Sequence, residues 1–149
     1  MSVDAGIDFL FKSAITPSAL VKALLGTGWG PDPEGEMSLY PPADPAQAPW
    51  DNDWQKVKGG DISYLVTWVA RLDEPSGEFG FDLFHRETGI CGPFLISDDR
   101  HSLRWATHAN IPYIVSHRNM VDFSKCMSVI FPAIKSAGLA IKRIEMYAQ

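Results

Sequence analysis

The sequence predicts a single α+β domain over residues 1–149, with a mostly antiparallel sheet and two or three helices packed on one face. Three observations support this class. Several segments alternate apolar and polar residues at period two and are joined by short turns, as antiparallel strands are. Other segments carry apolar stripes at helical spacing behind residues that can begin a helix. The length of 149 residues is close to the commonest size of one domain, and no break in the pattern marks a second.

The N-terminal part predicts a strand and then a helix. In residues 7–12, Ile7, Phe9 and Phe11 fall on one side and Asp8 and Lys12 on the other, which indicates a strand with one buried face. Thr16 and Pro17 are typical of a helix start, because threonine can cap exposed amides and proline costs little in the first turn. The apolar stripe that follows is expected to end at Gly26 or Gly28.

The stretch from Gly30 to Gly60 has a different character. It holds six of the chain's 11 prolines, and only residues 36–40 look extended enough for a strand. The rest is expected to be a long surface excursion, which in a compact domain is usually functional or disordered.

From Asp61 the apolar residues again recur at period two. Residues 61–72, 79–83 and 90–96 are expected to form three strands of an antiparallel meander. The turns between them, at 75–77 and 87–89, are too short to hold a crossover helix.

Residues 98–108 are expected to form a short helix. Ser97 can cap its first turn, and Asp98 and Asp99 would complement the helix dipole there. A further strand is expected at 111–115.

A longer helix and a closing strand complete the chain. Asp122 can cap the helix and Gly138 can end it, while Pro132 is expected to bend it because proline removes a backbone hydrogen bond. Residues 139–147 read as the last strand.

Composition and the cysteines exclude several classes. The chain is 46% hydrophobic and 21% charged with a net charge of −5, and it has no apolar run of the roughly 20 residues that a membrane helix needs. Acids where a secretory signal would be basic, and two cysteines without a CxxC pair, favour a cytoplasmic protein with no membrane association. A single disulfide between Cys91 and Cys126 stays open.

No pattern of residues predicts a catalytic, metal or cofactor site. The four histidines lack the spacing of three or four that a helical metal pair needs, and the glycines of Gly-Thr-Gly-Trp-Gly follow a helix instead of opening one. A small hydrolase or transferase is an alternative reading. It would need a histidine to meet a carboxylate in a cleft, and the candidates are His85, His101 and His117 with Asp82, Asp98 and Asp99.

The distribution of charge is the informative feature. Residues 1–55 hold eight acidic and two basic residues (−6), whereas residues 56–149 hold ten and eleven (+1). Aromatic residues are interleaved with the acids between 31 and 55, where no base occurs. Buried aromatics anchor interfaces and acids steer a basic partner, so the segment predicts a docking surface. The predicted partner-binding residues are Asp32, Glu34, Glu36, Tyr40, Trp50, Asp51, Asp53 and Trp54.

A second interpretation of this segment is a solvated proline-rich loop whose tryptophans fold back onto the sheet. The same two interpretations apply to Trp29, which lies just before the segment. Nucleic acid is not an expected partner, because the net charge is negative and the run Arg100, Arg104, His108 is explained by a solvated helix face.

A small acidic α+β chain with scattered tryptophans, an early helix at Pro17 and no active-site motif resembles the immunity proteins of bacterial polymorphic-toxin and contact-dependent growth inhibition systems. The resemblance is of general type and carries no residues over. It implies a non-enzymatic inhibitor that binds a cognate toxin, often a nuclease, with the acidic segment on a basic toxin surface. A third alternative is a homo-oligomeric or secretion-accessory subunit, in which the aromatic segment meets a copy of itself.

Overall fold

The computed structural model describes residues 5–41, 54–57, 61–73, 77–107, 112–114 and 117–148. Within these ranges the chain forms three helices and ten strands. In chain order they are β1 (Ala5–Phe11), α1 (Pro17–Gly26), β2 (Trp29–Gly30), β3 (Met37–Tyr40), β4 (Gln55–Val57), α2 (Ile62–Ala70), β5 (Phe79–His85), β6 (Cys91–Ile96), β7 (Ser102–Thr107), β8 (Tyr113–Ile114), β9 (His117–Val121), α3 (Phe123–Ser136) and β10 (Ile141–Ala148).

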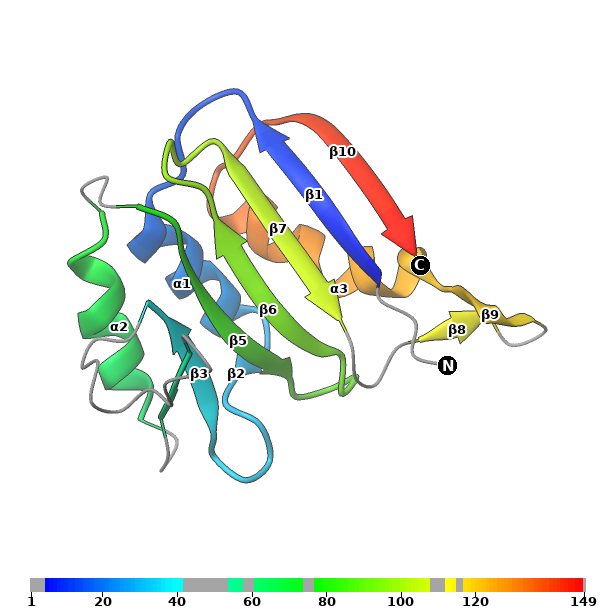
Figure 1. Ribbon diagram of the computed structural model, residues 1–149, viewed down its shortest axis with the longest axis horizontal. Helices are drawn as coiled ribbons and strands as arrows, with labels where there is room; N and C mark the ends of the chain where they lie inside the picture. The colour runs from blue at the N-terminus through cyan, green and yellow to red at the C-terminus, as the bar shows by residue number, and fades with distance from the viewer. Residues whose placement is uncertain are drawn as a thin grey trace.

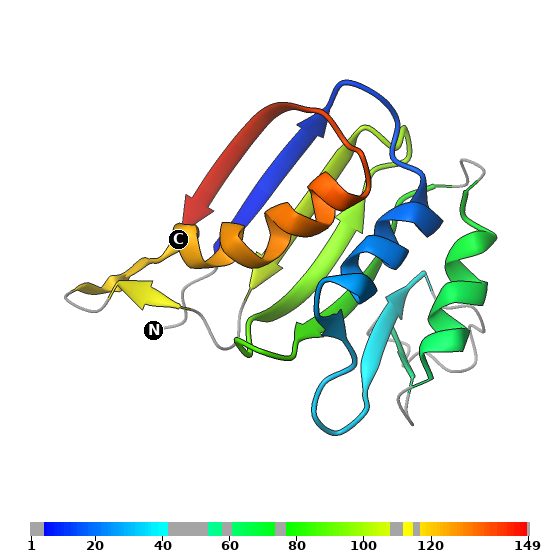
Figure 2. The ribbon, with the colours of Figure 1, turned by 180° about the vertical axis from the view of Figure 1, so that it is seen from behind.

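One large sheet organises the molecule. Its strand order is β10-β1-β7-β6-β5-β3-β4, with β2 pairing beside β3 on β5, and every pair is antiparallel. Helices α1 and α3 lie behind this sheet in Figure 1 and in front of it in Figure 2. Helix α2 covers the same face, because its Trp68 ring packs against Phe79 of β5 at 6.0 Å. The expected α+β class, with helices on one face, is confirmed.

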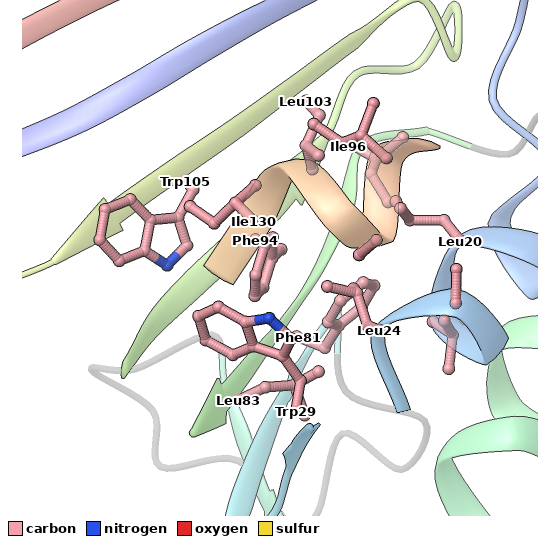
Figure 3. Packing of buried hydrophobic residues seen from close by; sticks show 14 of the residues in the cluster. Leu20, Leu24, Trp29, Phe81, Leu83, Phe94, Ile96, Leu103, Trp105 and Ile130 are labelled. Atoms are coloured by element: carbon pink, nitrogen blue, oxygen red, sulfur yellow. The ribbon is translucent and has the colours of Figure 1, made fainter. Parts of the chain in front are cut away.

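The core lies between the sheet and the helices. Strand residues alternate, so that Phe79, Phe81 and Leu83 of β5 are buried toward the helices. The close-up in Figure 3 shows the core between α1, α3 and the central strands, with Trp29 beside Phe94. Each large side chain buried here stabilises the fold by about 1.5–3 kcal/mol relative to exposure. The opposite face of the sheet carries no helix within the described ranges (Figure 1).

Several predicted elements are confirmed. The strand expected at 7–12 is β1, the helix after Pro17 is α1, and the strands expected at 36–40 and 139–147 are β3 and β10. One detail is wrong: Thr16 precedes α1 but makes no side-chain capping hydrogen bond.

Helix α3 begins and ends as expected. The carboxylate of Asp122 accepts from the backbone N–H of Lys125 at 3.2 Å, and Gly138 follows the helix at φ 73°. Pro132 lies inside the helix, on its exposed side.

The strand predicted at 61–72 is wrong, because this segment forms helix α2. The same run also holds apolar residues at helical spacing, since Leu65, Trp68 and Val69 form the buried face of the helix, whereas Ile62 and Val66 of the period-two pattern are exposed. Asp61 starts the helix, since its carboxylate accepts from the N–H of Tyr64 at 3.1 Å.

The helix predicted at 98–108 is also wrong. Ser97 and Asp99 do not cap a helix but hold a β-turn: the hydroxyl of Ser97 donates to Asp99 at 2.6 Å, and Asp99 accepts from the N–H of His101 at 3.0 Å. Arg100 adopts φ 64° in this turn, and strand β7 follows. The solvated helix face expected for Arg100, Arg104 and His108 is therefore wrong: Arg100 is buried in the turn, Arg104 lies on strand β7, and His108 lies outside the described residues.

Two further regions differ from expectation. The short strand β4 lies within the stretch expected to be mainly loop, and β2 ends at its first residue, Gly30. The strand expected at 111–115 is β8, which pairs with β9 in a separate two-stranded sheet. None of the described helices has both the length and the apolar character required to cross a membrane.

Candidate docking surface

The structure describes five of the eight predicted partner-binding residues. Three are acids in or beside the turn between β2 and β3, and two are aromatics at the ends of β3 and β4. They are Asp32, Glu34, Glu36, Tyr40 and Trp54. The other three, Trp50, Asp51 and Asp53, lie outside the described residues.

Asp32 organises the turn that carries the acids. Its Oδ1 accepts from the backbone N–H of Glu34 at 2.9 Å and of Glu36 at 2.8 Å. Its backbone carbonyl also accepts from Gly35, which adopts φ 79°. The carboxylate of Asp32 therefore shapes the turn. The carboxylates of Glu34 and Glu36, by contrast, form no ion pair within the described part of the chain.

Tyr40 and Trp54 form an aromatic pair on the helix-free face of the sheet. Their ring centroids are 5.5 Å apart with the planes at 34°, and both side chains are half-buried. The pair sits over Gly80 of β5, where a Cβ would lie 3.0 Å from Cη2 of Trp54. The absence of a side chain at Gly80 therefore leaves room for the indole of Trp54 against the sheet.

A hollow of about 300 Å³ lies on the same face, next to the acidic turn. Three carboxylates line it, from Asp32, Glu36 and Asp82, with Lys56 as its one basic residue among the lining residues. Lys56 and Asp82 meet here because of the strand register, in which Ser38 of β3 lies opposite Lys56 of β4 on one side and Asp82 of β5 on the other. The remaining lining residues are Met37, Ser38, Leu83, Phe84 and Cys91.

We refer to the following residues as the acidic–aromatic surface: Asp32, Glu34, Glu36, Tyr40, Trp54 and Asp82. Asp82 was not among the predicted docking residues. The alternating sequence of β5 could have indicated this residue. Asp82 stands between Phe81 and Leu83, which face inward, so its side chain faces outward.

A second hollow on the helix-free face, of about 280 Å³, has a different electrostatic character. Asp8 forms an ion pair with Arg104 at 2.8 Å, and Glu145 forms one with Arg143 at 3.3 Å. With Glu78 the second hollow is lined by three carboxylates and two arginines, so it is less negative by one charge than the first hollow, which has a single lysine.

Trp29 does not belong to the surface. It is 1% exposed, and its indole N–H donates to the backbone carbonyl of Val129 at 2.9 Å. The aromatic residue nearest to the acidic turn in the chain is thus part of the core, on the side of the sheet that faces the helices.

The histidine–carboxylate alternative gains no support from the described residues. His85 is buried, and its ring nitrogens lie 2.9 Å from the Thr88 hydroxyl and 3.2 Å from the Thr27 carbonyl oxygen. Nδ1 of His101 lies 2.9 Å from the backbone carbonyl oxygen of Asp99, so the ring forms this hydrogen bond with the backbone of Asp99 and not with its carboxylate. Ser97 and the N–H of His101 hold the pKa of Asp99 below its usual value, as expected of a turn residue.

Among the described residues, neither the metal-ligating side chains nor the two thiols form a recognisable site. In the part of the chain that the structure describes, no three histidine, cysteine or acidic side chains are grouped to hold a metal ion. Both cysteines are free thiols. Burial raises the pKa of Cys126 to about 11, so this thiol is protonated at neutral pH and packs as an apolar group.

Comparisons of the chain with protein-family models, with curated proteins and with solved structures find no match. The function is therefore inferred from the residues and geometry of the surface.

Proposed function

We propose that this chain is a non-enzymatic inhibitor of the immunity-protein type, which binds a basic toxin protein through the acidic–aromatic surface. One observation carries the proposal. A half-buried aromatic pair lies next to a hollow with three carboxylates and one lysine, on the face of the sheet that no described helix covers.

The two parts of this surface supply different contributions to binding. Tyr40 and Trp54 offer large rigid rings that lose little conformational entropy when a partner covers them, so they slow dissociation. The carboxylates raise the rate of encounter with a cationic surface and set its orientation. A row of carboxylates can also take the place of substrate phosphates in the basic cleft of a nuclease.

The turn geometry separates the acids by role. Asp32 is occupied by two backbone N–H groups, so its removal would disturb the turn itself. Glu34 is exposed and Glu36 half-buried, and neither carboxylate is needed to hold the turn. These two residues are therefore the ones to change in a binding test.

The test uses affinity capture with the full chain as bait in an extract of the source organism, followed by co-expression of the captured protein with the chain. We expect a basic protein whose toxicity to growth is relieved by the wild-type chain. Glu34→Lys and Glu36→Lys should each slow association about tenfold at low salt, and less at high salt. Trp54→Ala should mainly accelerate dissociation.

A matched control is Asp98→Lys, which makes the same charge change in the exposed turn before β7; because Asp98 lies near the buried Arg100, circular dichroism first checks that this variant keeps the fold. It should leave association unchanged beyond the small effect of net charge. Equal effects of Glu34→Lys and Asp98→Lys, or a captured protein that is acidic or harmless, would contradict the proposal.

A further inference from the structure

Strand β10 forms one edge of the main sheet (Figure 1). Ile141–Ala148 pairs with β1 on one side, and no described strand pairs with its other side. An edge strand of this length presents a row of backbone N–H and C=O groups that can accept another strand. The opposite edge strand, β4, has only three residues.

The helix side of β10 exposes apolar side chains. Ile144 and Met146 lie opposite Phe9 and Ile7 of β1 in the register, so they face the same side as the core. Phe9 and Ile7 are at most 1% exposed, whereas Ile144 is 36% and Met146 46% exposed. The helix layer thus covers β1 but leaves β10 open.

Helix α3 also exposes an apolar side chain. Phe131 is 43% exposed and lies about 200° around the helix from Val129, whose carbonyl meets Trp29. Phe131 therefore lies on the side of α3 away from Val129 and Trp29.

The charges of β10 are complementary to those of a second β10. When two copies of a strand pair antiparallel about a two-fold axis, the central residue faces itself and its neighbours face each other in reverse order. With Ile144 at the centre, Arg143 of each copy lies opposite Glu145 of the other, and Lys142 lies opposite Met146. The stem of Lys142 can then cover Met146 while its ammonium reaches water.

Neighbouring registers are unfavourable. Centring the pair on Lys142, Arg143 or Glu145 sets identical charges directly opposite each other, which destabilises a sheet. Centring on Ile144 also brings a cation to Glu145, which already lies opposite the carboxylate of Asp8 across β1 and β10. Four charged residues would then lie side by side across the joined sheets: Arg104, Asp8 and Glu145 of one copy, followed by Arg143 of the second copy.

We infer that two copies of this chain pair antiparallel through β10, with Ile144 at the centre, and so join their sheets into one. This inference does not rest on the proposed function. The acidic–aromatic surface lies at the β3–β4 end of the sheet, so each copy of the dimer keeps it open.

The test measures the mass of the full-length chain by sedimentation over a range of concentrations. The wild type should form a dimer. Arg143→Glu sets glutamates opposite each other, and Glu145→Arg sets arginines opposite each other. Each variant should therefore raise the dimer Kd about tenfold or more. Both side chains are more than half exposed, so the fold itself should tolerate the changes, and circular dichroism checks this.

Mixing the two variants gives the decisive measurement. A chain with Glu at 143 and 145 is complementary to a chain with Arg at 143 and 145, so the equimolar mixture should form a heterodimer with about wild-type affinity. Ile144→Lys should abolish the dimer by placing two cations at its centre. A wild type that stays monomeric at all concentrations, or a dimer that the single variants and the mixture leave unchanged, would overturn the inference.

Discussion

Two fully buried tryptophans differ in how their indole N–H groups are satisfied. Trp29 donates to the carbonyl of Val129, and so ties the end of β2 to helix α3 across 100 residues of sequence. Trp105 of β7 is also completely buried, but its Nε1 finds no acceptor within the described part of the chain. A buried donor without a partner lowers stability, because it has lost its hydrogen bond to water.

This difference makes a matched pair of substitutions informative. Trp29→Phe and Trp105→Phe remove a similar volume from the same core, but only the first removes a hydrogen bond and only the second removes an unsatisfied donor. We expect Trp29→Phe to lower the free energy of unfolding by about 1 kcal/mol more than Trp105→Phe. Urea titrations of the two variants measure the difference. Equal losses, or a larger loss for Trp105→Phe, would count against this account of the core.

Arg100 is the most unusual charged residue of the molecule. It is 2% exposed, and its guanidinium donates to the carbonyls of Gly77, Ser97 and Leu72 and lies 4.7 Å from the centre of the Phe79 ring. Burial lowers its pKa, and nearby Asp98 partly opposes this effect. The side chain thus fastens the end of α2 and the start of β5 to the turn before β7, which is a structural role.

At the level of elements, two of the three helices begin in the same way. Asp61 before α2 and Asp122 before α3 each accept a backbone N–H three residues ahead and a serine hydroxyl two residues ahead. The hydroxyls of Ser63 and Ser124 are the largest cause that lowers the pKa of each carboxyl below 3.8, and the backbone N–H groups lower it further.

These shifts predict a dependence of stability on pH. Because the carboxyl pKa is lower in the folded state, the two caps contribute their full stability above pH 3.8 and lose it as the pH falls through the folded pKa. Asp61→Asn and Asp122→Asn keep an oxygen acceptor that does not titrate. Their urea midpoints should therefore fall less steeply than that of the wild type below pH 3.8, and curves that run parallel down to the lowest pH would contradict this origin.

For the molecule as a whole, stability is distributed unevenly between the two sheets. The main sheet and the three helices that back it together hold almost all of the buried side chains among the described residues. The two-stranded sheet of β8 and β9 lies beyond its edge (Figure 1). A two-stranded sheet is marginally stable in water unless it is packed against other elements.

Hydrogen exchange should report this difference. We expect the amides of β8 and β9 to exchange at least about a hundredfold faster than those of β5 and β6, because they can open without unfolding the main sheet. Mass spectrometry of peptic fragments after deuterium labelling measures the rates. Similar protection of both regions would show that the small sheet unfolds only together with the core.

The sequence by itself determined the fold class and the elements with a strong local signal. β1, α1, β5, β6, α3 and β10 follow from periodicity, turn residues and a helix-capping aspartate, all of which act between residues close in the chain.

Only the tertiary structure decided the rest. In 61–72 the apolar residues suit a strand or a helix equally well, and the packing of Trp68 on Phe79 selects the helix. The direction of Trp29 is likewise set by an acceptor 100 residues away. Asp82 and Trp54 join the acidic turn because of the register of β3, β4 and β5, which local patterns do not encode. The physical reason is common to all of these cases: local propensities differ by a fraction of a kcal/mol to about 1 kcal/mol per residue, whereas burial of one large side chain against a distant partner contributes about 1.5–3 kcal/mol.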